Sequence, residues 1–350
     1  MGAEGARAPR LRLCVGEFLH PSGATTPRYA GRSHRKLPPM PIYECDPWRR
    51  QYFTEVDCPP DVHIPTDDTD GYNFNPRHRW IYNKLLVAQS QGLACGLAGT
   101  APARYPVFCK PVTNLKGMGA GSCLLQDESD YREKCKPGDF WMKLMTGEHI
   151  STDWAVVRGE TAWCRHTLGI PGVAGTFDYW VIQARGRPGL EKYCRDWITA
   201  YLPDYTGMLN IETIGGRIIE MHLRFSDQWP DLYGREWLNA TVRLYQHHRW
   251  DFADSERADG YSVVLFGPHG IPYVHPTPKM LNSYRSTLGV SSVQITFFED
   301  RPQQSHVMPP GGFRLAIVNS LGLEAGMRVR ATMARDFGLH ALERREKLAV

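Results

Sequence analysis

The 350-residue sequence predicts an α+β fold in which helices and antiparallel hairpins are intermixed. Two observations lead to this prediction. Short segments with the alternation of strands occur in pairs joined by glycine-containing turns, which is typical of β-hairpins. Segments with the spacing of amphipathic helices fall between these pairs, without the regular strand–helix alternation of a doubly wound parallel sheet.

The bulk composition is that of a globular protein and argues against several classes. Apolar residues make up 42% and charged residues 22% of the chain. The net charge of +4 comes without a basic run, so nothing supports a nucleic-acid partner. No apolar stretch is long enough to span a membrane, and the N-terminus lacks a hydrophobic signal core. We therefore expect a cytoplasmic protein with no membrane partner.

The nine cysteines form no CxxC pair. Because a chain of this length can fold without disulfides, we expect reduced thiols. A zinc site assembled from distant Cys and His residues stays open, but no spacing indicates one.

The first 75 residues predict an irregular N-terminal region. Residues 1–40 are rich in Gly, Pro, Arg and Ser, and their one apolar patch, 11–19, is expected to form a strand. Several prolines in residues 41–76 argue against a long helix. The acidic run at 67–70 lacks the later ligands of a calcium loop and is expected to be a turn.

Periodicity predicts the remaining elements in chain order. They are a helix over 78–93, strands over 105–111 and 122–126 around a glycine-rich turn, an apolar run over 140–145, two strands within 147–169 that turn at Arg158-Gly159-Glu160, a helix over 190–203, a hairpin over 206–224 with Gly215-Gly216 at its tip, a helix over 235–248, strands within 260–273, 291–300 and 311–320, and a helix over 323–339.

The hairpin over 206–224 carries an unusual polar row. Alternate residues of a strand share a face, so Ile218, Glu220, His222 and Arg224 are expected on one face. The opposite face would present the apolar residues between them to a core.

The same hairpin should bring two carboxylates together. With the turn at Gly215-Gly216, Glu212 lies near Glu220 after a small register shift or bulge. Two close carboxylates repel each other unless a cation lies between them, and hard oxygen ligands suit Mg²⁺. The alternative is two exposed glutamates paired with Arg217 or Arg224.

A glycine-rich segment, FCKPVTNLKGMGAGS, follows the strand over 105–111. Lys110 ends the strand, and the glycines of the loop let backbone N–H groups turn toward an anion, which favours a phosphate-binding loop. The spacing is not that of a P-loop, and a tight hairpin that needs glycine is the alternative. The apolar run 140–145 could similarly be a hinge beside an adenine ring or a core strand.

The order of these segments resembles the ATP-grasp superfamily, especially its biotin-carboxylase-like branch. A helix with Lys84 precedes the lysine–glycine-loop hairpin, the apolar hinge, and NIET followed by IIEMHLR, which is similar to the family's IEMNxR metal hairpin. The resemblance covers residues 76 to about 337. It implies a small lid hairpin domain plus a larger mixed-sheet domain with a short atypical N-terminal region, divided as 1–75, 76–150 and 151–350.

The resemblance also implies roles for individual residues. Arg224 and Lys110 would be the catalytic pair, and two Mg²⁺ ions, with Mn²⁺ as an alternative, would be held at the metal hairpin. His222 departs from the family's usual asparagine, and the hinge lacks the acid that accepts from the adenine amino group. The implied ATP-binding residues are Lys84, Lys110, Gly119, Ala120, Gly121, Ser122, Met142 and His149, and the implied metal ligands are Glu212, Glu220 and His222.

The function that the resemblance implies is ATP-dependent ligation of a small-molecule carboxylate to an amine through an acyl phosphate. The alternatives are an ATP-dependent carboxylase or small-molecule kinase on the same fold, and a diverged nucleotide-binding protein without catalysis. A homodimer is compatible with the carboxylase-like branch.

Overall fold

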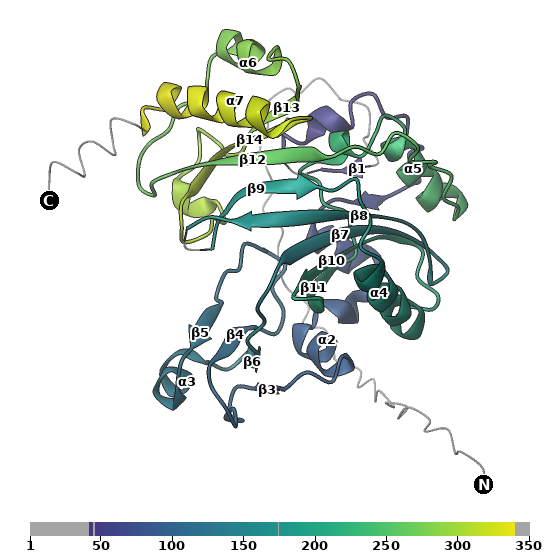
Figure 1. The fold of residues 1–350 in the computed structure, drawn as a ribbon, viewed down its shortest axis with the longest axis vertical. Helices are drawn as coiled ribbons and strands as arrows, with labels where there is room; N and C mark the ends of the chain where they lie inside the picture. Colours follow the sequence, from purple (N-terminus) through teal and green to yellow (C-terminus); the bar gives the residue numbers. More distant parts are fainter. Residues whose placement is uncertain (1–41, 45, 174, 340–350) are drawn as a thin grey trace, which may run out of the picture. The chain divides into compact units, whose positions relative to one another are not determined.

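The computed structural model describes residues 42–44, 46–173 and 175–339, all within one compact unit that spans residues 39–350 (Figure 1). The strand expected at 11–19 lies outside the described residues. None of the described helices is both long and apolar enough to cross a membrane. The seven described cysteines are free thiols, as expected.

An eight-stranded antiparallel sheet forms the framework of the unit (Figure 1). Its strands alternate buried and more exposed positions or are buried throughout, as expected for a sheet covered by helices. Across the sheet the strands are β11 (Arg217–His222), β10 (Gly207–Ile214), β7 (His149–Val157), β8 (Glu160–Pro171), β9 (Phe177–Ile182), β12 (Gly260–Gly267), β14 (Phe313–Ser320) and β13 (Val290–Ile295).

Helices cover both faces of this sheet. Trp154 packs with α4 (Pro188–Tyr201), whereas its neighbour Ala155 packs in the cluster that contains α5 (Trp237–His247), so these two helices lie on opposite faces of β7. Helix α7 (Leu323–Asp336) packs on β12 and β14. These three helices and most strands of the large sheet confirm the sequence prediction.

A second, four-stranded sheet precedes the large one in the chain. The hairpin predicted around the glycine-rich turn is confirmed, since β4 and β5 pair antiparallel. The apolar run is confirmed as a strand, β6, that pairs with β4. In order across the sheet the strands are β3 (Cys95–Leu97), β6 (Asp139–Lys143), β4 (Val107–Pro111) and β5 (Cys123–Leu125), with α3 (Glu128–Lys134) after β5.

The segment before residue 76 contributes to the core of the unit. Ile42, Phe53 and Ile64 are buried in the same hydrophobic cluster as Trp237 of α5. The turn expected at 67–70 is wrong, because the Asp67 side chain accepts from the Asp70 N–H and starts a helix. The elements here are β1 (Ile42–Tyr43), η1 (Arg50–Tyr52), β2 (Ile64–Pro65) and α1 (Asp68–Phe74).

The helix predicted over 78–93 is two elements, η2 (Arg79–Tyr82) and α2 (Lys84–Ser90). Asn83 separates them because its backbone is extended and its side chain accepts from the Leu86 N–H, which makes it the N-cap of α2. Beyond residue 76, the elements that periodicity did not indicate are β3, α3, β9, α6 (Pro278–Arg285), η3 (Pro230–Leu232) and η4 (Gln303–Ser305).

A β-bulge alters the predicted alternation of β11. Glu212 pairs with Glu220 while the next residue, Thr213, pairs with Ile218, which leaves Ile219 as the extra residue. The prediction that Ile218 shares a face with Glu220 is therefore wrong. Ile218 belongs instead to the hydrophobic cluster that contains the buried residues of α4.

Candidate active site

The two glutamates of the β10–β11 hairpin, the predicted metal hairpin, pair across the strands as the sequence predicted. Ile214 and Arg217 flank the Gly215-Gly216 turn, and Glu212 lies directly opposite Glu220. The alternative partners are wrong: the Arg217 guanidinium lies 5.2 Å from the centre of the Tyr193 ring, and Arg224 pairs with an aspartate. The face that carries the two glutamates is the one opposite to α4.

His222 lies between these carboxylates. Its Nε2 atom is 3.6 Å from Glu212 Oε1 and 3.6 Å from Glu220 Oε1, and this buried nitrogen has no hydrogen-bond partner in the described part of the chain. Its Nδ1 atom is 2.8 Å from Asp68 Oδ1. Burial disfavours the charged ring, but Asp68 more than offsets this and raises the pKa of His222 to about 9.

Glu212 has a second imidazole partner. His149, the first residue of β7, places Nε2 at 3.0 Å from Glu212 Oε2. Burial would raise the pKa of Glu212, but the hydrogen bond from His149 and the charge of the nearby His222 ring hold it well below the ordinary value. Glu212 is therefore ionised and available as an anionic ligand.

The two predicted lysines lie against Glu220. Lys84, the first residue of α2, places Nζ at 2.8 Å from Glu220 Oε2 and is almost completely buried. Lys110 of β4 donates from Nζ to the Ile219 carbonyl at 2.7 Å. Burial lowers the pKa of Lys110 to about 8, with Glu220 acting in the opposite direction. Lysines from two elements thus converge on the metal hairpin.

Arg224 joins the cluster through Asp68. Its Nε donates to Asp68 Oδ1 at 2.9 Å, so one carboxylate holds both the guanidinium and the His222 ring. Although burial opposes charge on Arg224, Asp68 raises its pKa further above the usual range. Asp68 was not among the predicted site residues. The local signal for it was Asp67, whose side chain caps the N-terminus of α1 and so places Asp68 in the first turn.

Other predicted residues lie apart from this cluster. Gly119, Ala120 and Gly121 are exposed, and the N–H groups of Ala120 and Ser122 donate to carbonyls within the loop itself. Among the described residues, no hydrogen bond or ion pair joins this loop to the glutamates. Met142 is buried in the cluster that packs β6 against α2. Contacts of these residues with a nucleotide stay predictions.

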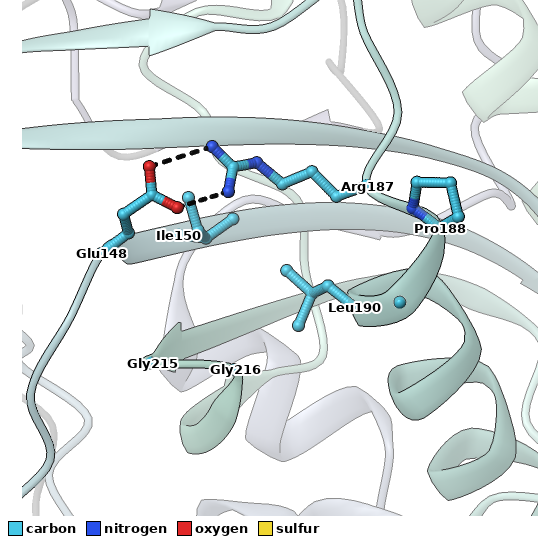
Figure 2. Close-up of a pocket in the computed structure, with 8 residues that line it drawn as sticks. Glu148, Ile150, Arg187, Pro188, Leu190, Gly215 and Gly216 are labelled. Carbon is cyan, nitrogen blue, oxygen red and sulfur yellow. Dashed lines mark hydrogen bonds and ion pairs between the residues drawn. The ribbon is translucent and has the colours of Figure 1, made fainter.

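Two cavities adjoin the segment of residues 144–148 between β6 and β7, which is the predicted hinge. One, of about 640 Å³, is lined by residues 147–149, 168–172 and 175–177. The other, of about 320 Å³, lies at the N-terminus of α4 beside the Gly215-Gly216 turn and the Glu148–Arg187 ion pair (Figure 2). Neither is lined by the lysines or by the paired glutamates.

The donor set at the hairpin fits a divalent cation. Glu212 and Glu220 each place one carboxylate oxygen 3.6 Å from the partnerless His222 Nε2, and the other ring nitrogen is held by Asp68, as is usual behind a metal-bound imidazole. Carboxylate ligands suit both Mg²⁺ and Mn²⁺.

Comparisons with known proteins identify the fold. No family model matches the sequence, and no curated protein matches it. An L-amino acid ligase from Bacillus licheniformis is similar in structure, with a TM-score of 0.55 and 13% identity over 82% of each chain. A phosphoribosylamine–glycine ligase from Thermotoga maritima has a TM-score of 0.55 and 13% identity over 79% of this chain and 83% of that one.

A third similar structure is the carboxyaminoimidazole ribonucleotide synthase of Aspergillus clavatus complexed with ATP, with a TM-score of 0.53 and 14% identity over 74% of this chain and 72% of that one. The chain has the ATP-grasp fold, which confirms the fold prediction. Of the residues predicted from the resemblance, Lys84 lies on α2 and Lys110 on the small sheet. Glu212 and Glu220 lie on the β10–β11 hairpin, and Arg224 follows β11.

Proposed function

We propose that the chain is an ATP-dependent ligase that joins a small-molecule carboxylate to an amine through an acyl phosphate. The observation that carries this proposal is the convergence of two buried lysines from separate elements on a pair of directly opposed glutamates. Charged groups gathered in this way with shifted pKa values are typical of functional sites.

Lys84 and Lys110 are the proposed phosphate ligands. In the structure their ammonium groups contact Glu220 and a neighbouring carbonyl, which substitute for the anionic ligand. A triphosphate would offer them stronger partners, and its charge would favour the protonated form of Lys110, whose pKa burial lowers to about 8.

Glu212, Glu220 and His222 are the proposed ligands of Mg²⁺, two ions in the full complex, with Mn²⁺ as an alternative. Bound there, the cation would neutralise the phosphate oxygens and orient the γ-phosphate. Asp68 fixes the His222 ring, and His149 fixes Glu212, so that the donor atoms keep their directions.

Arg224 and Lys110 are the proposed catalytic residues. A substrate carboxylate oxygen attacks the γ-phosphorus, ADP leaves, and an amine nitrogen then displaces phosphate from the acyl carbon. The guanidinium and the ammonium stabilise the charge that develops on the transferring group. Gly119, Ala120, Gly121 and Ser122 would close over the phosphates and exclude water, while Met142 and His149 lie on the hinge side of the nucleotide.

The test is a screen of amino-acid and other carboxylate–amine pairs with ATP and Mg²⁺. ADP and phosphate release are measured together with product mass. We expect an amide product, and we expect Glu220→Gln to lower kcat by at least about 100-fold because it removes a charged ligand present during the chemistry. Glu160→Gln, at an exposed glutamate of β8, is the matched control and should retain activity.

The rival functions give different results in the same assay. A phosphorylated product with ADP release would indicate a kinase, and a product that requires bicarbonate would indicate a carboxylase. Binding of ATP with no ADP release from any pair would contradict the ligase and indicate a nucleotide-binding protein without catalysis. Full activity of Glu220→Gln would show that the assigned metal site is wrong.

A further inference from the structure

A second cluster of ligand-type side chains lies on the face of the large sheet that α4 covers. Cys164 and His166 are two residues apart on β8 and therefore share this face, and Glu191 projects from the first turn of α4. Their Sγ, ring nitrogen and carboxylate atoms all lie within 4.8 Å of one another. We propose that these three side chains bind a transition-metal ion of the zinc class.

The distances are those of a site that needs little rearrangement. Zinc binds sulfur at about 2.3 Å and nitrogen or oxygen at about 2.0–2.2 Å, so tetrahedral ligands lie about 3.3–3.6 Å apart. His166 Nε2 is 3.1 Å from Glu191 Oε1, slightly closer than this spacing. A bound ion would draw the three atoms, which lie within 4.8 Å of one another, to this spacing, and water would fill the fourth position.

The imidazole is oriented for this role. His166 is 2% exposed, and its Nδ1 atom lies 2.9 Å from the Thr152 hydroxyl on the neighbouring strand. This contact fixes the ring so that Nε2 faces Glu191, as the outer partners of metal-bound histidines do. Burial lowers the pKa of His166, with Glu191 opposing, so the ring is neutral and its nitrogen is a competent ligand.

The thiol has no competing role in the described structure. Within residues 46–173 and 175–339, no hydrogen bond uses Cys164 Sγ. Burial raises the pKa of Cys164 to about 12, and Glu191 adds to this, so the thiol is protonated until a metal displaces the proton. Metal binding should therefore release about one proton near neutral pH.

The surrounding charges are compatible with the ion. Arg187 and Arg257 have carboxylate partners of their own, at 2.6 Å from Glu148 and 2.8 Å from Asp254. Arg257 and Arg195 lower the pKa of Cys164, which favours the thiolate that a metal requires. The two negative charges of thiolate and carboxylate would balance a divalent cation.

This cluster is separate from the proposed ATP site. It lies on the opposite face of the sheet from Glu212 and Glu220, and it would join β8 to the start of α4. A metal there should stabilise the fold by mass action, since binding to the folded state alone shifts the unfolding equilibrium. The inference does not depend on the proposed ligase function.

The test uses the full chain, freed of metal with a chelator and kept reduced because the Cys194 thiol interacts with Cys164. Co²⁺ is titrated first and followed by absorption, and Zn²⁺ is then added to displace it. We expect a thiolate-to-cobalt charge-transfer band, visible bands of a tetrahedral ion, displacement by one equivalent of Zn²⁺, and a higher Tm with Zn²⁺. The proposed Mg²⁺ site of Glu212, Glu220 and His222 has no thiol ligand and cannot give the charge-transfer band.

Cys164→Ser and Glu191→Gln should lower the affinity for Zn²⁺ by at least about tenfold, and Cys164→Ser should abolish the charge-transfer band. Cys135→Ser, at a partly buried cysteine that directly follows α3, is the matched control and should bind as the natural chain does. Circular dichroism checks that each variant is folded. A titration without the thiolate band, or equal Zn²⁺ affinity in folded Cys164→Ser, would overturn the proposal.

Discussion

Glu44 is a buried acid whose ionisation opposes folding. It is 6% exposed, and its Oε1 accepts from the Asp46 N–H at 2.8 Å. Burial, with Asp227 adding and Arg49 opposing, raises its pKa to about 8. In the unfolded chain the carboxyl ionises near 4.5, so between these values the native state holds a proton that the unfolded state has lost.

The free energy of unfolding should therefore decrease as pH rises from about 5 to 8, because the slope follows the difference in bound protons. We expect Glu44 to contribute a loss on the order of 3 kcal/mol across this window, since one pKa unit is worth about 1.4 kcal/mol. Urea denaturation at several pH values measures it. Glu44→Gln should flatten the profile and Glu160→Gln should not; an unchanged slope in Glu44→Gln would contradict the assignment.

At the same scale, sequence predicted the pair of glutamates but not their partners. Glu212 and Glu220 belong to one hairpin, so a turn at Gly215-Gly216 almost determines their register. Asp68 contacts His222 across 154 residues of sequence, and no local pattern can indicate such a contact. The histidine in place of asparagine is explained only by this long-range carboxylate.

At the scale of elements, the glycine turn of the metal hairpin is tied to the hinge that follows the small sheet. Gly215 donates from its N–H to the Glu148 carbonyl at 3.1 Å, and a Cβ on Gly215 would lie 2.2 Å from the Thr146 carbonyl oxygen. Gly216 has a similar positive φ of 75°, but a Cβ there would meet nothing within 4 Å.

The two glycines therefore form a matched pair for substitution. Gly216→Ala should cost about 1–2 kcal/mol of stability through the left-handed backbone alone. Gly215→Ala should cost more, by about 1–3 kcal/mol, because the hinge must also move, and its KM for ATP should rise. Chemical denaturation and steady-state kinetics measure these effects. Equal costs for the two variants would show that the hinge contact is unimportant.

Elements were predictable where their signals were local. Amphipathic spacing located α4, α5 and α7, and turn residues located the hairpins. The helix over 78–93 was predicted as one element because apolar spacing continues through Asn83, whose side-chain cap divides it. A small register shift or bulge between Glu212 and Glu220 was predicted, and the structure has the bulge at Ile219. That the bulge turns Ile218 to the opposite face from Glu220 was not predicted, because it depends on the packing of the whole sheet.

At the scale of the whole molecule, the early segment of the chain is part of the core. Residues 42–66 read as irregular because prolines and turn residues dominate them, but their apolar side chains complete the cluster around Trp237. Contacts between distant segments are set by the tertiary structure and leave little trace in local periodicity. The order of the lysine, glycine-loop and glutamate segments could still be recognised, because the order of segments along the chain does not depend on tertiary contacts.

The small sheet carries the glycine-rich loop of residues 113–122, which is mostly exposed or half-buried and has positive φ at Gly117, Met118, Gly119 and Gly121. If the loop covers bound phosphates, its contacts with the nucleotide stabilise the closed loop against local opening. We expect ATP with Mg²⁺ to slow amide hydrogen exchange across 113–122 by at least about tenfold, since each 1.4 kcal/mol of added stability slows exchange tenfold.

Amides in the middle of α7, which packs on the other end of the large sheet, serve as the internal control and should exchange at unchanged rates. Glu220→Gln should weaken the protection, because the variant lacks one ligand of the cation that accompanies the nucleotide. Exchange measured by mass spectrometry resolves the loop from its flanking strands. Protection of α7 and the loop to the same degree would indicate general stabilisation, and an unprotected loop with ATP bound would show that it does not close over the phosphates.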